Sequence, residues 1–135
     1  MILLPDYYNN KISAVTPEIT VNSIDLLYKV NQLLMGFVLA GNSFKINPNT
    51  QCLISGSKDG DGGFRLSNSK TGSPLSSHKT GMGVDVYDPE NKIDDWVTDL
   101  ILKKYDLYRE APGYTNHWCH LSTRVPGSGH RTFIP

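Results

Sequence analysis

Two histidines and one aspartate are the residues of this sequence whose types and spacing point to chemistry. His78 and Asp85 lie seven positions apart in the stretch SSHKTGMGVDVYDP, with two glycines between them that allow the backbone to turn. His120 follows in WCHLST. Two imidazoles and one carboxylate suit a catalytic zinc ion, which keeps a fourth position open for water. We therefore expect these three residues to bind Zn²⁺, whose chemistry includes the hydrolysis of peptide bonds.

A metal-free pairing explains part of the same pattern in another way. Asp85 is expected on a strand with apolar neighbours, and a half-buried carboxylate needs a partner because an isolated buried charge is unfavourable. His78 could supply that partner in a structural His–Asp pair without any metal. The sequence leaves this alternative open beside the zinc site.

The composition is that of one globular domain without a strong net charge. The chain has 135 residues, long enough for a single domain (residues 1–135) with a core and too short for two ordinary ones. Thirteen basic residues balance thirteen acidic ones, so we expect no nucleic-acid partner. No apolar run approaches the roughly 18 residues of a membrane helix, so we expect no membrane insertion.

The first ten residues, MILLPDYYNN, do not resemble a signal peptide. Their short apolar run is interrupted by a proline and an aspartate and has no basic residue before it. We therefore expect synthesis in the cytoplasm without a signal peptide. Any target outside the cell must then be reached by another route.

Helical and strand patterns predict an α+β domain. Residues 16–37 and 88–105 carry apolar residues at helical spacing, and each range has a proline where its first turn is expected. Four short apolar or alternating runs predict strands: QCLISG, GVDVY, WCHLST and RTFIP. The chain lacks a regular βαβ rhythm, which favours a compact single domain with a small antiparallel sheet and two main helices.

The alternation in two of these strands bears on the zinc site. In GVDVY the two valines share one face, so Asp85 points to the other. In WCHLST, His120 points opposite to Cys119, which is expected to face the core. If the two strands are neighbours, His120 converges on the pair formed by His78 and Asp85.

Two motifs of the sequence are similar to those of a peptidase family. SSHKTGMGVD resembles the S-x-H-x-x-G-x-x-x-D signature of the zinc D-Ala-D-Ala carboxypeptidases and L-alanyl-D-glutamate endopeptidases. HWCHL resembles the W-x-H strand of the same family. The closing stretch RVPGSGHRTFIP looks like small phage or prophage forms of the domain. The resemblance covers roughly residues 50–135, with the predicted helix between the two motifs in the expected place.

This resemblance implies a hedgehog-like α+β fold in which His78, Asp85 and His120 are the zinc ligands. It implies zinc-dependent hydrolysis of peptide bonds in the stem peptides of bacterial peptidoglycan, by a carboxypeptidase or an endopeptidase. A small phage-related form acts on the cell wall after release or from a phage particle, and we expect a monomer. The alternative function is a zinc-stabilised, non-catalytic wall-binding or phage structural module.

Two positions depart from the family pattern, and each leaves two candidate residues. The family often has S-G-x-R, whose arginine binds a substrate carboxylate or the oxyanion, but here that position is Lys58 and Arg65 follows. We favour Arg65 because a guanidinium can donate two parallel hydrogen bonds to a carboxylate. Many relatives have an acidic base three positions before the last ligand, where this chain has His117. We favour His117 as the catalytic base, with Glu110, in an expected loop, as its competitor.

Overall fold

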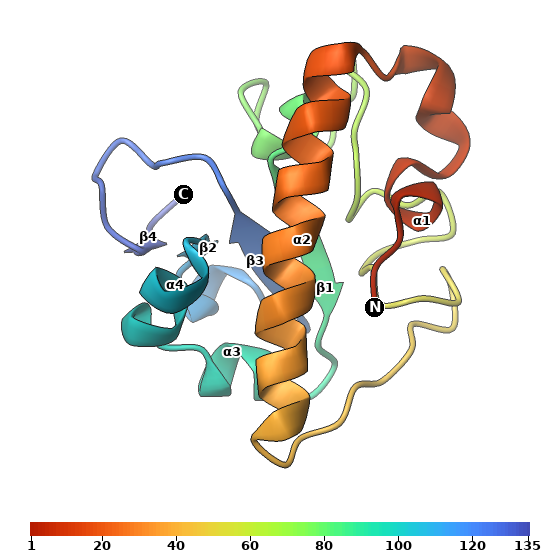
Figure 1. Cartoon of the computed structure of the whole chain (residues 1–135). Helices are drawn as coiled ribbons and strands as arrows, with labels where there is room; N and C mark the ends of the chain where they lie inside the picture. Colours follow the sequence, from red (N-terminus) through yellow and green to blue (C-terminus); the bar gives the residue numbers. More distant parts are fainter.

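A long helix and a four-stranded sheet form the frame of the molecule (Figure 1). The computed structural model describes all 135 residues. In chain order the elements are α1 (Leu4–Tyr8), the 3-10 helix η1 (Asn9–Ala14), α2 (Pro17–Leu39), the 3-10 helix η2 (Ser77–Thr80), β1 (Gly83–Tyr87), α3 (Lys92–Trp96), α4 (Asp99–Tyr105), β2 (Tyr108–Glu110), the 3-10 helix η3 (Pro112–Tyr114), β3 (Trp118–Ser122) and β4 (Thr132–Phe133).

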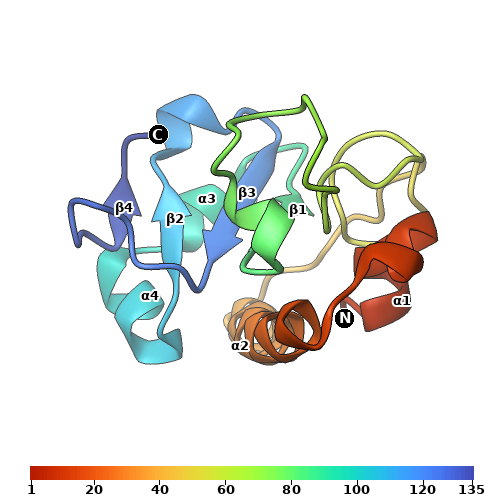
Figure 2. The ribbon, with the colours of Figure 1, turned by 90° about the horizontal axis from the view of Figure 1, so that it is seen from above.

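Helix α2 confirms the helix expected at 16–37 and supports the sheet. Thr16 caps it by accepting a hydrogen bond from the backbone N–H of Ile19, and Pro17 occupies the first turn, where an N–H would have no helical partner. In both ribbon views α2 lies across one face of the sheet (Figure 2). Neither α2 nor any shorter helix is long and apolar enough to cross a membrane. The buried apolar face of α2 consists of Leu26, Leu27, Val30, Leu33, Leu34 and Phe37.

The sheet has the strand order β1-β3-β2-β4 and is mixed rather than purely antiparallel. Strand β3 pairs antiparallel with both β1 and β2, whereas β4 runs parallel to β2. The loop after β3 carries the chain past β2 to its outer edge, so β4 runs in the direction of β2 (Figure 2). The expected α+β domain with a small sheet is confirmed. The expectation of a purely antiparallel sheet is wrong, because β4 pairs parallel with β2.

The single helix expected at 88–105 consists of two helices. Helix α3 ends because Val97 and Thr98 are extended. The side chain of Thr98 then caps α4 by accepting from the backbone N–H of Ile101. Ile93 and Val97 are both buried, which explains why the apolar spacing continues across the break.

The apolar run QCLISG does not form a strand. It makes only two isolated bridges, between Asn47 and Cys52 and between Ile54 and Val86. Leu53 and Ile54 are nevertheless buried in the core, and backbone hydrogen bonds from Ser55 to Asp85 and from Tyr87 to Leu53 hold the run beside β1. The fourth strand is instead β2, a segment of three residues that carries no recognisable pattern.

The sheet separates an apolar face from a polar one. Val84 and Val86 of β1 and Cys119 of β3 belong to the buried cluster that includes the inner face of α2. Alternation turns Asp85 and His120 to the opposite face. The directions expected for these five side chains are therefore confirmed, and the predicted ligands lie on the face away from α2.

Candidate metal centre

A row of side chains crosses the polar face of the sheet. Asp85 of β1 lies opposite His120 of β3, and Glu110 of β2 lies opposite Phe133 of β4. The antiparallel register of β2 and β3, extended by one residue, sets Glu110 beside His120. Facing residues on neighbouring strands point to the same side of a sheet. Asp85, His120, Glu110 and Phe133 therefore form one row in strand order.

His78 reaches the same place from η2, which precedes β1. The side chain of Ser76 caps η2 by accepting from the backbone N–H of His78. Gly81 ends η2 with a φ of 77°, a left-handed conformation that glycine adopts without strain. A Cβ on Gly81 would also lie 2.6 Å from Oγ of Ser23 on α2. The turn expected between His78 and Asp85 is therefore present, and it packs closely on the long helix.

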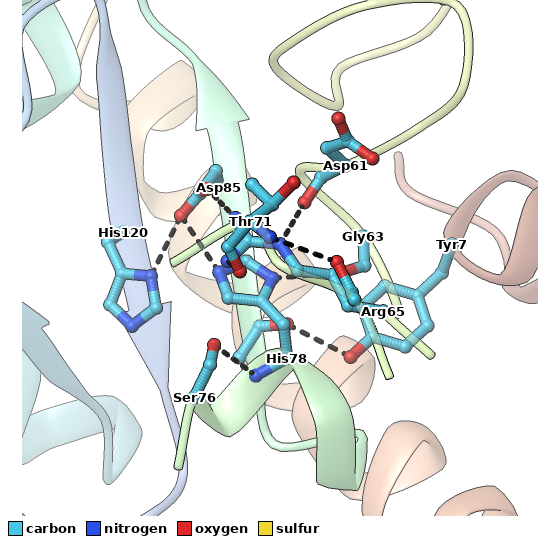
Figure 3. A network of polar contacts seen from close by, with 11 residues as sticks. Tyr7, Asp61, Gly63, Arg65, Thr71, Ser76, His78, Asp85 and His120 are labelled. Carbon is cyan, nitrogen blue, oxygen red and sulfur yellow. Dashed lines mark hydrogen bonds and ion pairs between the residues drawn. The ribbon is translucent and has the colours of Figure 1, made fainter. Parts of the chain in front are cut away.

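The three predicted ligands meet on this face (Figure 3). Oδ1 of Asp85 lies 2.8 Å from Nδ1 of His120 and 3.2 Å from Nε2 of His78. All three potential ligand atoms lie within 4.8 Å of one another. The side chains are removed from solvent, with 2% of His78, 8% of Asp85 and 4% of His120 exposed. The group could hold a metal ion, so the expected convergence of the three residues is confirmed.

Neighbouring groups determine which atom of His78 and which atom of Asp85 faces the centre. Nδ1 of His78 donates a hydrogen bond to the carbonyl oxygen of Gly63 at 2.8 Å, so Nε2 is the nitrogen that faces Asp85. Nη2 of Arg65 lies 3.3 Å from Oδ2 of Asp85, which leaves Oδ1 turned toward both histidines. One nitrogen from each imidazole and one carboxylate oxygen are donors that suit a zinc ion with an open fourth position. The residues present therefore fit the metal.

Asp85 and His120 stabilise each other's charged forms. Burial alone would raise the pKa of Asp85, but the charges and hydrogen bonds of His78 and His120 hold it well below its usual value. Burial alone would lower the pKa of His120, but the hydrogen bond and charge of Asp85 raise it, with a further contribution from the charge of Glu110. Without metal, a proton on His120 therefore adds positive charge beside the carboxylate, together with the guanidinium of Arg65.

Metal binding by this group should strengthen as the pH rises. A metal ion needs the neutral imidazole of His120, whose raised pKa keeps it protonated above the ordinary value of about 6.5. The same proton stabilises the metal-free fold. This stabilisation is complete at pH values below about 6.5, and it decreases as the pH rises through the raised pKa of His120. Zinc affinity, measured by competition with a chromophoric chelator at about pH 6, 7 and 8, should increase at each step. A constant affinity would show that His120 releases no proton on binding.

The ligand cluster opens into a cavity of about 500 Å³. Besides the three ligands, its wall includes the carboxylate of Glu110, the ring of Phe133 and two cationic side chains, Arg65 and Arg124. The ring of Phe133 stands edge-on to that of His120, with 6.3 Å between the ring centres. A molecule in this cavity therefore meets the ligand cluster together with a carboxylate and two guanidinium groups.

His117 does not face the ligand cluster. It is exposed, and its positive φ of 77° turns the chain just before β3. Nδ1 of His117 lies 3.0 Å from the carbonyl oxygen of Pro89, and its backbone N–H donates to the side chain of Asn91. These contacts hold the ring beside the residues that precede α3. The expectation that His117 lies close enough to the metal centre to act as the base is therefore wrong. Of the two candidate bases, Glu110 is the one that lines the cavity.

Of the two candidate cations, Arg65 lies at the site and Lys58 does not. Lys58 is exposed and lines a separate hollow beside α1. Arg65 is largely buried, and its three guanidinium nitrogens contact the carbonyl oxygens of Asp61 and Thr71 and the carboxylate of Asp85. The guanidinium is thus engaged in holding a metal ligand and the loops around it.

Arg124 is a cavity residue that the sequence did not single out. It lies two residues after β3, and its Nη1 donates to the carbonyl oxygen of Leu75. Arg124 also borders a second hollow in the C-terminal loop, which shares Pro126 and Phe133 with the first. The one sequence signal for Arg124 is its position just past a ligand-bearing strand, where loop residues reach the site that the strand supports.

No protein-family model, curated protein or solved structure matches this chain. The similarity of the two motifs to the zinc peptidases therefore stands without a match over the whole chain. Any inference of function depends on the ligand cluster, its cavity and those motifs.

Proposed function

We propose that the protein is a zinc-dependent peptidase that hydrolyses peptide bonds in the stem peptides of bacterial peptidoglycan. The main support is the buried cluster of His78, Asp85 and His120, which opens into a cavity lined by the carboxylate of Glu110. Structural zinc sites are closed by four protein ligands, whereas catalytic sites offer three and an open position. The peptidoglycan substrate and a phage-related origin, with action on the wall after release or from a phage particle, follow from the two motifs.

Each residue around the cavity has its own role in the proposed hydrolysis of a peptide bond. The three ligands would hold a zinc ion, whose Lewis acidity would polarise a peptide carbonyl and acidify a water molecule. Glu110 lines the cavity beside His120, where its carboxylate would accept a proton from the attacking water and pass it to the leaving amine. Arg65 keeps Asp85 in place and balances its charge. Arg124 binds a carboxylate of the substrate.

Replacing Arg124 by Gln should raise KM for stem peptides about tenfold or more, because a charge-assisted hydrogen bond to substrate is lost. Only Nη1 of the Arg124 guanidinium is bonded within the fold, whereas Arg65 uses all three nitrogens. Lys58→Gln is the matched control, since it removes a cation outside the cavity and should leave KM unchanged. Steady-state kinetics on purified stem peptides measures both. If Arg124→Gln and the wild type had equal KM values, Arg124 would not be the residue that binds the substrate carboxylate.

Digestion of purified peptidoglycan tests the proposed activity. We expect the zinc-loaded protein to release muropeptides, and we expect a chelator to abolish their release. Mass spectrometry of the products distinguishes a carboxypeptidase, which removes a terminal residue, from an endopeptidase, which cuts within the stem. A protein that binds zinc and releases nothing would instead be the zinc-stabilised, non-catalytic wall-binding or phage structural module.

A further inference from the structure

One loop contacts both of the ligands that the first motif supplies. The carbonyl oxygen of Gly62 accepts from the backbone N–H of Asp85 at 2.7 Å, and that of Gly63 accepts from Nδ1 of His78 at 2.8 Å. The backbone N–H of Arg65 donates to the carbonyl oxygen of His78, while its side chain contacts the carboxylate of Asp85. We call the four residues from Gly62 to Arg65 the support segment. It holds the backbone and the side chain of both ligands.

Tyr7 of α1 holds the support segment from its other side (Figure 3). The carbonyl oxygen of Tyr7 accepts a hydrogen bond from the backbone N–H of Phe64 at 2.9 Å. The Tyr7 hydroxyl donates to the carbonyl oxygen of Gly83, at the start of β1, also at 2.9 Å. Because Tyr7 is fully buried, this one residue rigidly connects α1, the support segment and the strand that carries Asp85.

The close approach of α1 requires glycine at position 63. A Cβ on Gly63 would come closer to the carbonyl oxygen of Tyr7 than real Cβ atoms approach other heavy atoms. A side chain therefore fits there only if the support segment moves away from Tyr7. Such a movement displaces the Gly63 carbonyl oxygen, which orients the ring of His78.

We propose that Tyr7 and the support segment are positioning residues that set the metal affinity of the site by orienting His78 and Asp85. The proposal rests on the metal centre alone and is independent of the reaction carried out there. An imidazole whose second nitrogen donates to a fixed acceptor is held in one tautomer and one ring orientation, which strengthens its bond to a metal ion. Helix α1 is accordingly part of the metal centre, although it contributes no ligand.

Two glycine variants test this proposal. Gly63→Ala should lower zinc affinity about 10- to 100-fold, the range for losing a group that orients a ligand. Gly113→Ala is the matched control, because nothing lies within 4 Å of a Cβ at that position, and it should bind zinc as the wild type does. Competition with a chromophoric chelator measures the affinity. The visible absorption spectrum of the Co²⁺ forms reports the ligand geometry, which a general loss of stability would not alter.

Tyr7→Phe is the second variant, and it keeps the buried ring while removing only the hydrogen bond to Gly83. We expect a smaller loss of zinc affinity than in Gly63→Ala, together with a shifted Co²⁺ spectrum. If both variants had the zinc affinity and the Co²⁺ spectrum of the wild type, the positioning role of Tyr7 and the support segment would be wrong, while the metal centre would stand. If the wild-type protein bound no zinc, both the positioning proposal and the metal centre would be wrong. Zinc binding without peptidoglycan hydrolysis would remove the proposed function and not this inference.

Discussion

Replacing Glu110 by Gln should lower kcat on stem peptides by at least about 100-fold, the lower range for loss of a general base. The amide keeps the size of the carboxylate but cannot accept a proton from water. Zinc content, measured by elemental analysis, should remain at the wild-type level because Glu110 is outside the ligand cluster. The combination of bound metal and lost turnover is the signature of a base rather than a ligand.

His117→Ala is the matched control for this prediction. The ring of His117 is exposed and contacts the carbonyl oxygen of Pro89, away from the cavity. Its removal should therefore leave both kcat and zinc content unchanged. Full activity in Glu110→Gln, with an inactive but zinc-loaded His117→Ala protein, would return the role of base to the histidine.

His120→Ala should abolish zinc binding and all hydrolysis, because it removes one of only three protein ligands. It also removes an imidazole that stabilises the charge of the buried Asp85, so the remaining carboxylate is a poorer site. Elemental analysis after dialysis against metal-free buffer measures the loss. His130→Ala, at an exposed histidine of the C-terminal loop, is the control and should retain zinc. Stoichiometric zinc in His120→Ala would show that the ligand is wrongly assigned.

The two ligand-bearing strands could be predicted because their pattern is local. Alternation in GVDVY separates Asp85 from the two valines, and alternation in WCHLST separates His120 from Cys119. Since side-chain direction repeats every two residues in a strand, the sequence predicts that each ligand points away from the core-facing residues of its own strand. The structure adds the register, in which Asp85 lies directly opposite His120.

The parts of the site that depend on tertiary contacts could not be predicted from local patterns. The sequence predicts a loop around Glu110, because the three residues of β2 are too few for an alternation to be recognised. Its position three residues before His120 makes His117 a candidate base, but the left-handed turn at His117 directs its ring away. The path of Arg65 toward Asp85 is set by contacts with α1 and β1, and a glycine-rich loop does not specify such a path by itself.

Titration of the metal-stripped wild-type protein with zinc is the most direct test of the metal centre. We predict one zinc ion per chain, and a midpoint of thermal unfolding that rises with zinc concentration because the three ligands meet only in the folded state. No zinc binding, with an unchanged unfolding midpoint, would contradict the metal centre and leave His78 and Asp85 as a metal-free structural pair.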